Sequence, residues 1–278
     1  MSLTINDEHF LAGDNVSLIS TPKNKQKFKT GMPDSIIIHY TAGKSAQSSA
    51  KYLSRNDVKA SAHIVLGRDG RILHLVPFDT VSWHAGRSEY GGRKWYNNFS
   101  IGIEIDNAGP LTKVGNEFQS WFGQRYPENE AVQGVHRNES RPRYWHAYTP
   151  TQIEVCEDIC RLLIEKYNIK SILGHEEIAP GRKQDPGPAF PLDRFRNNLL
   201  FNDRADENDV PASLPKSGKV IPDKLNIRAG SGAGFDKVAR ALRRGTEVEI
   251  LDEDNGWYKV STKIEGWVSK GYIEPKSE

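Results

Sequence analysis

The sequence predicts a mixed central β-sheet flanked by helices, followed by a small all-β domain. Two continuous apolar runs, residues 35–40 and 171–175, are typical of strands that are buried on both faces of a sheet. An amphipathic pattern over residues 149–167 predicts a long helix that packs on such a sheet. A polar stretch with two prolines then indicates a linker. We therefore expect an α/β domain at residues 1–202, a linker at 203–215 and a second domain at 216–278.

Further strand and helix signals alternate within the first domain. Residues 45–56 predict a helix, and residues 61–77 predict a hairpin whose turn is formed by an Asp-Gly pair. Residues 99–106 predict a strand, because apolar residues alternate there with residues of other kinds. Residues 107–148 show no sustained period and are rich in aromatic residues, arginine and glycine. An irregular segment of this length tends to be functional or disordered, and its aromatic residues argue against plain disorder.

The second domain consists of short strand patterns with turn residues between them. The patterns are KLNIRAG, TEVEILDED, GWYKVST and EGWVSKGYI, and an Asn-Gly pair at residues 255–256 supplies one of the turns. Several short strands separated by turn signals predict a small β-barrel.

Composition and charge exclude several classes of protein. The chain has 38 basic and 36 acidic side chains, and its net charge of +2 gives no reason to expect nucleic-acid binding. No apolar run reaches the roughly 18 residues of a transmembrane helix, so we expect no membrane span. The start, MSLTINDEHFLAG, lacks the basic and apolar regions of a signal peptide. We expect a soluble monomer.

The two cysteines lie on the apolar face of the predicted helix at residues 149–167. Cys156 and Cys160 are four residues apart, a spacing on a helix that is poorly suited to a disulfide bond. We therefore interpret them as small core residues, in line with the strong tendency of cysteine to be buried.

Two of the predicted strands each end in a histidine. His39 and His175 close the two apolar runs, and ligands of open α/β sheets gather where strands end. Asp185 follows ten residues after His175, on a segment stiffened by prolines. A His/His/Asp set leaves a fourth tetrahedral position for water, which is the pattern of a catalytic zinc site. Taken singly, each histidine is more often a hydrogen-bonded structural residue.

Two further residues could supply the rest of a hydrolytic site. In an extended segment Lys183 would point the same way as Asp185, and Arg182 would point away. A lysine there could stabilise negative charge on a tetrahedral intermediate. Glu104 lies on the face of its strand opposite the isoleucines, where it could take a proton from water. The alternative is that Glu104 is merely solvated, as a lone glutamate on a strand usually is.

Four motifs together resemble a known family. In chain order they are IIIHYTAG, SAHIVLGRDGRILHLVPFDTVSWHAG, FSIGIEID and GHEEIAPGRKQDPGPAF. They are similar to those of the zinc-dependent N-acetylmuramoyl-L-alanine amidases of the amidase-2 family, in its AmpD/AmiD-like branch. The resemblance covers residues 33–200, and it rests on four linked motifs rather than on one.

The resemblance implies an activity and a set of site residues. The activity is cleavage of the amide between the lactyl group of N-acetylmuramic acid and L-alanine. The implied cofactor is Zn²⁺, with ligands at His39, His175 and Asp185, a catalytic carboxylate at Glu104 and a charge-stabilising Lys183. The long insert after residue 106 departs from the family pattern, which puts the substrate range in doubt rather than the zinc site.

For several aromatic residues the sequence does not decide between a functional and a structural role. His63 and His84 resemble family positions that line or brace the groove, and Trp83 could stack on a sugar or belong to the core. The C-terminal domain resembles a bacterial SH3-like domain, which implies binding to the cell wall. Its Trp257, Tyr258 and Trp267 could form a ligand-facing patch or a core, so we assign no site there. We also leave three histidines unassigned: His74, His136 and His146.

Two classes of function remain, an amidase and a non-catalytic peptidoglycan-binding receptor. The presence of all five candidate residues favours the enzyme. A scaffold that binds proline-rich partners would leave residues 174–190 unexplained. The expected substrate is peptidoglycan or a muropeptide, without a decision between intact wall and anhydro-muropeptide. A wall-binding module favours the cell envelope, the exterior or phage lysis, whereas AmpD-like motifs also permit a cytoplasmic enzyme.

Overall fold

The computed structural model describes residues 3–201, 217–221, 224–230, 235–254 and 257–263. The chain divides into two compact units, Met1–Asp206 and Glu207–Glu278, and each is described here by itself. The division falls inside the polar stretch at residues 203–215.

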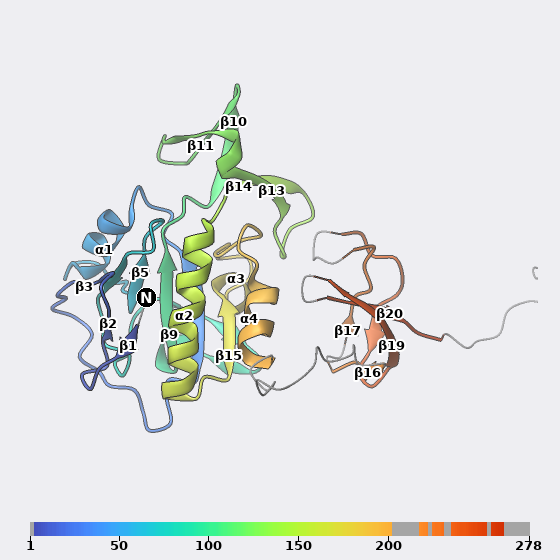
Figure 1. Cartoon of the computed structure of the whole chain (residues 1–278), viewed down its shortest axis with the longest axis horizontal. Helices are drawn as coiled ribbons and strands as arrows, with labels where there is room; N and C mark the ends of the chain where they lie inside the picture. The colour runs from blue at the N-terminus through green and yellow to red at the C-terminus, as the bar shows by residue number, and fades with distance from the viewer. Residues whose placement is uncertain (1–2, 202–216, 222–223, 231–234, 255–256, 264–278) are drawn as a thin grey trace, which may run out of the picture. The chain divides into compact units, whose positions relative to one another are not determined.

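A six-stranded mixed sheet forms the centre of the first unit (Figure 1). Its order is β15-β4-β9-β5-β6-β3, and every neighbouring pair is parallel except β5–β6, which forms the predicted hairpin. The bounds are β3 Val16–Leu18, β4 Ser35–Tyr40, β5 Ile64–Leu66, β6 Ile72–His74, β9 Ser100–Ile105 and β15 Ser171–Gly174. The predicted mixed α/β fold is confirmed.

Helix α2, Pro150–Tyr167, covers one face of this sheet. Ile38, Ile103 and Ile64 lie in one row across three strands, and they belong to the same buried cluster as Ile159 and Leu163 of the helix. The two cysteines are free and buried in that cluster, as predicted. Burial of these large apolar side chains, at roughly 25 cal/mol per Å², is the main stabilising contribution to this layer.

The ends of α2 are set by its flanking residues. The Thr149 hydroxyl accepts the N–H of Gln152 at 3.1 Å, and Oε1 of Gln152 accepts the N–H of Thr149 at 3.0 Å. This reciprocal capping box satisfies two N–H groups that the first turn would leave unpaired. Asn168 then ends the helix in the left-handed conformation, with φ of 56°.

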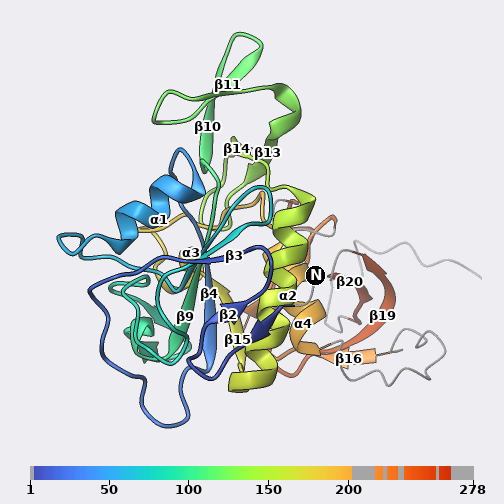
Figure 2. The same cartoon turned by 60° about the vertical axis from the view of Figure 1, so that its left-hand side comes forward.

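Helix α1, Ala46–Ser54, covers the other face. It packs against Val65 and Leu73, whose sequence neighbours Ile64 and Ile72 belong to the α2 cluster. Because successive side chains of a strand point to opposite faces, the two helices lie on opposite sides of the sheet (Figure 2). Two further helices follow β15: α3, His175–Ile178, and α4, Leu192–Phe201.

Residues 107–148, predicted to be irregular, contain a five-stranded antiparallel sheet in the order β12-β11-β10-β14-β13. We call this segment the insert sheet; it follows the end of β9 (Figure 1). Its strands are β10 Pro110–Val114, β11 Glu117–Gln119, β12 Arg125–Tyr126, β13 Ala131–Val135 and β14 Pro142–His146. They are short and exposed at fewer than half of their positions, and a small cluster around Leu111, Phe118 and Tyr126 is their own core. The sequence shows no period because no strand is long enough to display one.

Short elements complete the first unit. They are β1 Thr4–Ile5, β2 Leu11–Ala12, β7 Glu89–Tyr90, β8 Arg93–Lys94 and the 3₁₀ turns Tyr96–Asn98 and Glu128–Glu130. Within the described part of the chain, no helix is both long and apolar enough to cross a membrane.

In the second unit, strands are present at three of the four predicted patterns. β16 Ser217–Lys219, β19 Glu247–Asp254 and β20 Trp257–Ser261 form one antiparallel sheet, and β17 Lys224–Leu225 pairs with β18 Leu242–Arg243. Trp257 is half-buried and Tyr258 is exposed. The turn at residues 255–256, the last predicted strand and Trp267 lie outside the described residues.

Candidate metal centre and active site

The register of three parallel strands places three predicted site residues in one row. Gly174 pairs with Ile38, so His175, the first residue of α3, comes beside His39. His39 in turn pairs with Glu104 on β9. This row lies on the face opposite α2, because the neighbouring row of isoleucines faces that helix. The strand predicted at residues 171–175 ends one residue early, since His175 begins a helix.

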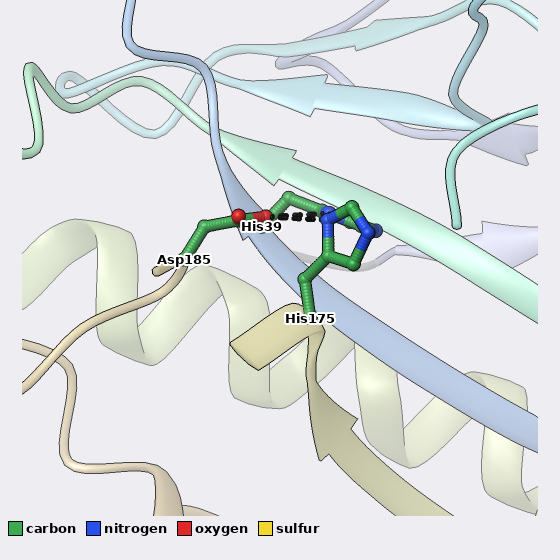
Figure 3. A group of neighbouring side chains, drawn as sticks. All are labelled: His39, His175 and Asp185. Carbon is green, nitrogen blue, oxygen red and sulfur yellow. Dashed lines mark hydrogen bonds and ion pairs between the residues drawn. The ribbon is translucent and has the colours of Figure 1, made fainter. Parts of the chain in front are cut away.

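His39, His175 and Asp185 meet in a buried cluster (Figure 3). The Nδ1 atoms of the two histidines are 2.9 Å apart. Oδ2 of Asp185 lies 2.8 Å from Nδ1 of His39 and 2.9 Å from Nδ1 of His175. The loop that carries Asp185 is fixed to α3, because the carbonyl of Asp185 accepts the N–H of Glu176 at 2.8 Å. The structure therefore brings together the three side chains predicted as metal ligands.

The outer nitrogens of both histidines are held by acceptors. Nε2 of His84 lies 3.1 Å from the carbonyl of Ser100, which can only accept, so this nitrogen carries the proton. Nδ1 of His84 is then an acceptor for Nε2–H of His39, at 3.0 Å. Nε2–H of His175 donates to the carbonyl of Ala85 at 3.1 Å. Both Nδ1 atoms therefore present lone pairs to Asp185.

The three groups of the cluster also shift one another's pKa values. Burial, together with the neighbouring His175, lowers the pKa of His39 to about 4, although Asp185 opposes the shift. Burial alone would raise the pKa of Asp185, but positive charge or a proton on the facing histidine nitrogens outweighs burial and lowers that pKa below its ordinary value. At neutral pH His39 is therefore neutral and Asp185 is ionised.

This arrangement fits a divalent metal ion. Two nitrogen lone pairs and a carboxylate oxygen, all within 3 Å of one another, repel unless a cation lies among them. Two imidazoles and one carboxylate are a donor set that zinc accepts, with one coordination position left open. The hydrogen bonds that Nε2 of His39 makes to His84, and Nε2 of His175 makes to the carbonyl of Ala85, are typical of histidines that bind a metal through the other ring nitrogen.

Glu104 lies beside this cluster without belonging to it. Its Oε2 is covered and has no hydrogen-bond partner in the described part of the chain. Burial and the negative charge of Asp185 raise the pKa of Glu104 well above its ordinary value, and Lys183 partly opposes them. A carboxyl group with a raised pKa next to a metal site is suited to general base chemistry.

Lys183 and Arg182 interact with different groups around the ligands. Lys183 is half-buried, and its charge lowers the pKa of both His39 and Glu104, behind the larger effect of burial at each group. Nη2 of Arg182 instead donates to the carbonyls of Ala85, at 2.8 Å, and Arg87, at 2.6 Å. Arg182 thus supports the carbonyl that orients His175, a role that the sequence did not indicate.

Of the remaining histidines in the first unit, His9 is half-buried, and the others are buried and hydrogen-bonded. His84 braces His39, and Gly102 makes room for it, since a Cβ at Gly102 would lie 2.3 Å from its ring. His63 bonds the carbonyl of Thr80 and the N–H of Gly102 on β9, so both family-like histidines have structural contacts, His84 with a ligand and His63 with β9. Trp83 is 43% exposed and is not a core residue.

Comparison with known proteins agrees with the geometry. The family model described as N-acetylmuramoyl-L-alanine amidase matches residues 29–188, and the bacterial SH3 domain model matches residues 223–274. The 1,6-anhydro-N-acetylmuramyl-L-alanine amidase AmpD of Escherichia coli is 37% identical over 141 residues, which are 50% of this chain and 58% of AmpD. The N-acetylmuramoyl-L-alanine amidase AmiD of Escherichia coli is 30% identical over 165 residues, 56% of this chain and 49% of AmiD.

Solved structures of an AmpD and of the AmiD of Escherichia coli are also similar to this chain. A crystal structure of AmpD has 26% identity and a TM-score of 0.46, covering 66% of this chain and 93% of that one. The complex of AmiD with anhydro-N-acetylmuramic acid-L-Ala-D-γ-Glu-L-Lys has 27% identity and a TM-score of 0.45, covering 69% and 64%. The chain spans about half to three-fifths of the length of these curated relatives. Because the family model matches more than half of its residues, the chain belongs to the N-acetylmuramoyl-L-alanine amidase family.

Proposed function

We propose that the chain is a zinc-dependent N-acetylmuramoyl-L-alanine amidase that acts on peptidoglycan or muropeptides. The observation that carries the proposal is the convergence of two imidazole lone pairs and one carboxylate beside Glu104, whose pKa is raised. Family membership supports the same reaction, the hydrolysis of the amide between N-acetylmuramic acid and L-alanine.

His39, His175 and Asp185 would hold the zinc ion. Zinc in such a site supplies a Lewis acid that activates water and polarises an amide carbonyl. Because both histidines are locked in one tautomer by His84 and Ala85, the ligands need little reorganisation to bind the metal.

Glu104 would move the protons of the reaction. It takes a proton from the attacking water as the new C–O bond forms at the lactyl carbonyl. It then gives that proton to the alanine nitrogen as the C–N bond breaks, so that a free amine and a carboxylic acid are released. The raised pKa of Glu104 suits both steps, because the group is a better base than an ordinary glutamate and can also return the proton.

Lys183 would stabilise the oxygen of the scissile carbonyl. Negative charge develops on that atom in the transition state, and a cation that faces the same site as Glu104 favours it. Such a group acts mainly on kcat, because the charge is absent from the bound substrate.

The C-terminal unit would attach the enzyme to the cell wall. Its match to the bacterial SH3 domain model supports this role, and we propose that the enzyme works as a monomer. The linker at residues 203–215 would join the two activities, in line with the proposed domains at 1–202 and 216–278.

The test is turnover of a defined muropeptide by the full chain. Anhydro-N-acetylmuramic acid bearing a stem peptide is incubated with the zinc-loaded protein, and the released peptide is detected by mass spectrometry. We expect release of a peptide with a free N-terminal alanine, loss of release after chelation and recovery on addition of zinc. Binding of the muropeptide by zinc-loaded protein without any release would contradict the proposal and favour a receptor.

A further inference from the structure

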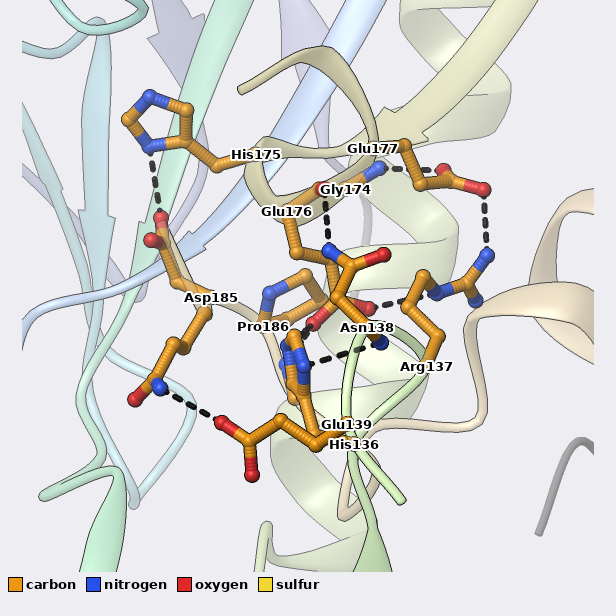
Figure 4. Close-up of polar contacts among 12 residues, drawn as sticks. His136, Arg137, Asn138, Glu139, Gly174, His175, Glu176, Glu177, Asp185 and Pro186 are labelled. Carbon is orange, nitrogen blue, oxygen red and sulfur yellow. Dashed lines mark hydrogen bonds and ion pairs between the residues drawn. The ribbon is translucent and has the colours of Figure 1, made fainter. Parts of the chain in front are cut away.

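A turn of the insert sheet contacts both chain segments that carry His175 and Asp185 (Figure 4). We call it the clamp turn, residues 136–139, between β13 and β14. The sequence interpretation connected the insert only with the substrate range. The contacts of this turn point instead toward the ligands of the metal site.

The clamp turn binds α3 through its side chains. Nε of Arg137 donates to Oε1 of Glu176 at 2.8 Å, and its Nη1 donates to Oε1 of Glu177 at 2.5 Å. Nδ2 of Asn138 donates to the carbonyl of Glu176 at 2.9 Å. Glu176 follows His175 directly in the chain, so these bonds fix the first turn of α3 and with it the backbone of the ligand.

Glu176 extends the same connection to the Asp185 loop. Its N–H donates to the carbonyl of Asp185 at 2.8 Å, and its Oε2 accepts the N–H of Gly187 at 3.2 Å. Oε1 of Glu139, the last residue of the clamp turn, accepts Nε2 of Gln184 at 2.9 Å. Gln184, which precedes Asp185, is therefore bonded to the clamp turn, and Gly187, two residues after Asp185, is bonded to Glu176.

Packing holds the insert sheet against this loop. A Cβ at Gly187, whose φ is +73°, would lie 2.9 Å from the ring of Trp145 on β14. A Cβ at Gly134 on β13 would lie 3.0 Å from Pro188. The ring of His136 stacks on Trp145, with centroids 5.6 Å apart. Backbone contact this close leaves the loop little freedom to shift relative to the clamp turn.

The charges at this contact are buried and depend on one another. The side chain of Glu176 is 3% exposed and that of Glu177 is 8% exposed. Arg137 links both carboxylates with one planar guanidinium group, and it also approaches Asp193 of α4 at 3.4 Å. Loss of Arg137 would leave Oε1 of the buried Glu176 without its donor, which favours rearrangement of the segment that carries it. Oε2 of Glu176 would still contact His136 and the N–H of Gly187, and Glu177 would still pair with Arg196.

The first ligand is supported differently. His39 lies within β4, and its orientation is set by His84 and by the strand ladder. His175 and Asp185 lie on a four-residue helix and on a loop, elements that do not fix a side chain by themselves. Two of the three ligands therefore depend on support from outside the central sheet.

We propose that Arg137 is a positioning residue of the metal site, which acts through Glu176 to hold His175 and Asp185 at their metal-binding separation. The inference rests on the proposed zinc site. It assigns the clamp turn a function in metal affinity, without any contact with the substrate or with the metal itself.

The test is the zinc affinity of the full chain, measured by competition with a chromogenic chelator. We expect Arg137→Met to bind zinc about 10- to 100-fold more weakly, the range found when a group that supports a ligand is lost. Arg93→Met is the control, because Arg93 forms an ion pair with Asp34, as Arg137 does with Glu176. Arg93 also lies over the ring of Phe99. Asp34 precedes β4 at the end of the strand away from His39, so this ion pair does not reach the ligands. The control should keep wild-type affinity.

A double variant tests whether Arg137 acts through Glu176. If it does, the loss of zinc affinity in Arg137→Met combined with Glu176→Met should be smaller than the product of the two single losses. Multiplicative losses would overturn the route through Glu176. Wild-type affinity in Arg137→Met would overturn the positioning role, whereas a wild-type chain that binds no zinc would overturn the zinc site itself.

A conservative variant covers the case in which Arg137→Met does not fold. Arg137→Lys keeps the charge but cannot bond Glu176 and Glu177 at once, because an ammonium group lacks the planar fork. We expect this variant to fold and to show an intermediate loss of zinc affinity. An affinity equal to that of the wild type would overturn the proposal.

Discussion

The central sheet and the insert sheet support the same site by different physical means. In the central sheet, long apolar strands are buried on both faces, and their register alone brings His39, Glu104 and the start of α3 into one row. In the insert sheet the strands are short and share only a small apolar cluster, and support comes from a few buried polar side chains around Arg137. The comparison shows that an active site can be supported both by a large core and by a peripheral segment whose own core is small.

The largest difference between the two sheets should be in their share of the free energy of unfolding. Ile103 on β9 is fully buried among the residues that face α2, so Ile103→Ala should lower stability by about 2–5 kcal/mol. Val132 on β13 is 38% exposed, so Val132→Ala should change stability by about 0.5 kcal/mol or less. Urea unfolding of both variants at neutral pH measures the contrast. Equal losses would mean that the insert sheet carries its own substantial core.

A smaller effect, limited to acid, should come from His74 on β6. Its Nδ1 accepts the N–H of Leu11, its Nε2–H donates to Val76, and burial lowers its pKa to about 4. Between about pH 6.5 and pH 4, His74 is protonated in the unfolded chain but stays neutral in the folded chain. Stability from this group is therefore complete above about pH 6.5 and falls toward pH 4, by up to about 3 kcal/mol.

His74→Gln isolates that contribution, because the amide can still donate to Val76. The variant should be less stable than the wild type at neutral pH. Its free energy of unfolding should fall less steeply as the pH is lowered, and the difference in slope should correspond to at most one proton. Urea unfolding between about pH 5 and pH 7 gives both slopes. An unchanged slope would show that His74 is not kept neutral by the fold. In the insert sheet, burial likewise lowers the pKa of His146 to about 4, so acid sensitivity is a property that the two sheets share.

The sequence predicted the parts of the site that follow from strand period. The apolar runs that end in His39 and His175, and the alternation around Glu104, require only a period of two and a parallel register. The insert sheet could not be predicted, because strands of two to five residues show no measurable period. The clamp turn could not be predicted either, because its contacts are distant in the sequence. Its bonds join residues about 40 positions apart, as from Arg137 to Glu176, and no local pattern records such a contact.

His84, which supports His39, could be predicted only in part. His84 was visible as a family-like position, but the sequence could not show that it accepts a hydrogen bond from His39. Its place depends on Gly102, whose missing Cβ leaves room for the ring, and that match arises only once β9 is folded against the loop at residues 82–86.

The most direct test of the account separates the proposed base from the proposed ligands. Glu104→Gln and Asp185→Ala are purified as full chains, and zinc content is measured beside muropeptide turnover. Glu104→Gln should retain near-stoichiometric zinc and lose about 10²- to 10⁴-fold in kcat, because only proton transfer is removed. Asp185→Ala should lose both zinc and turnover. The account would be contradicted if Glu104→Gln lost its zinc while Asp185→Ala kept it, because the base and the ligand would then have been exchanged.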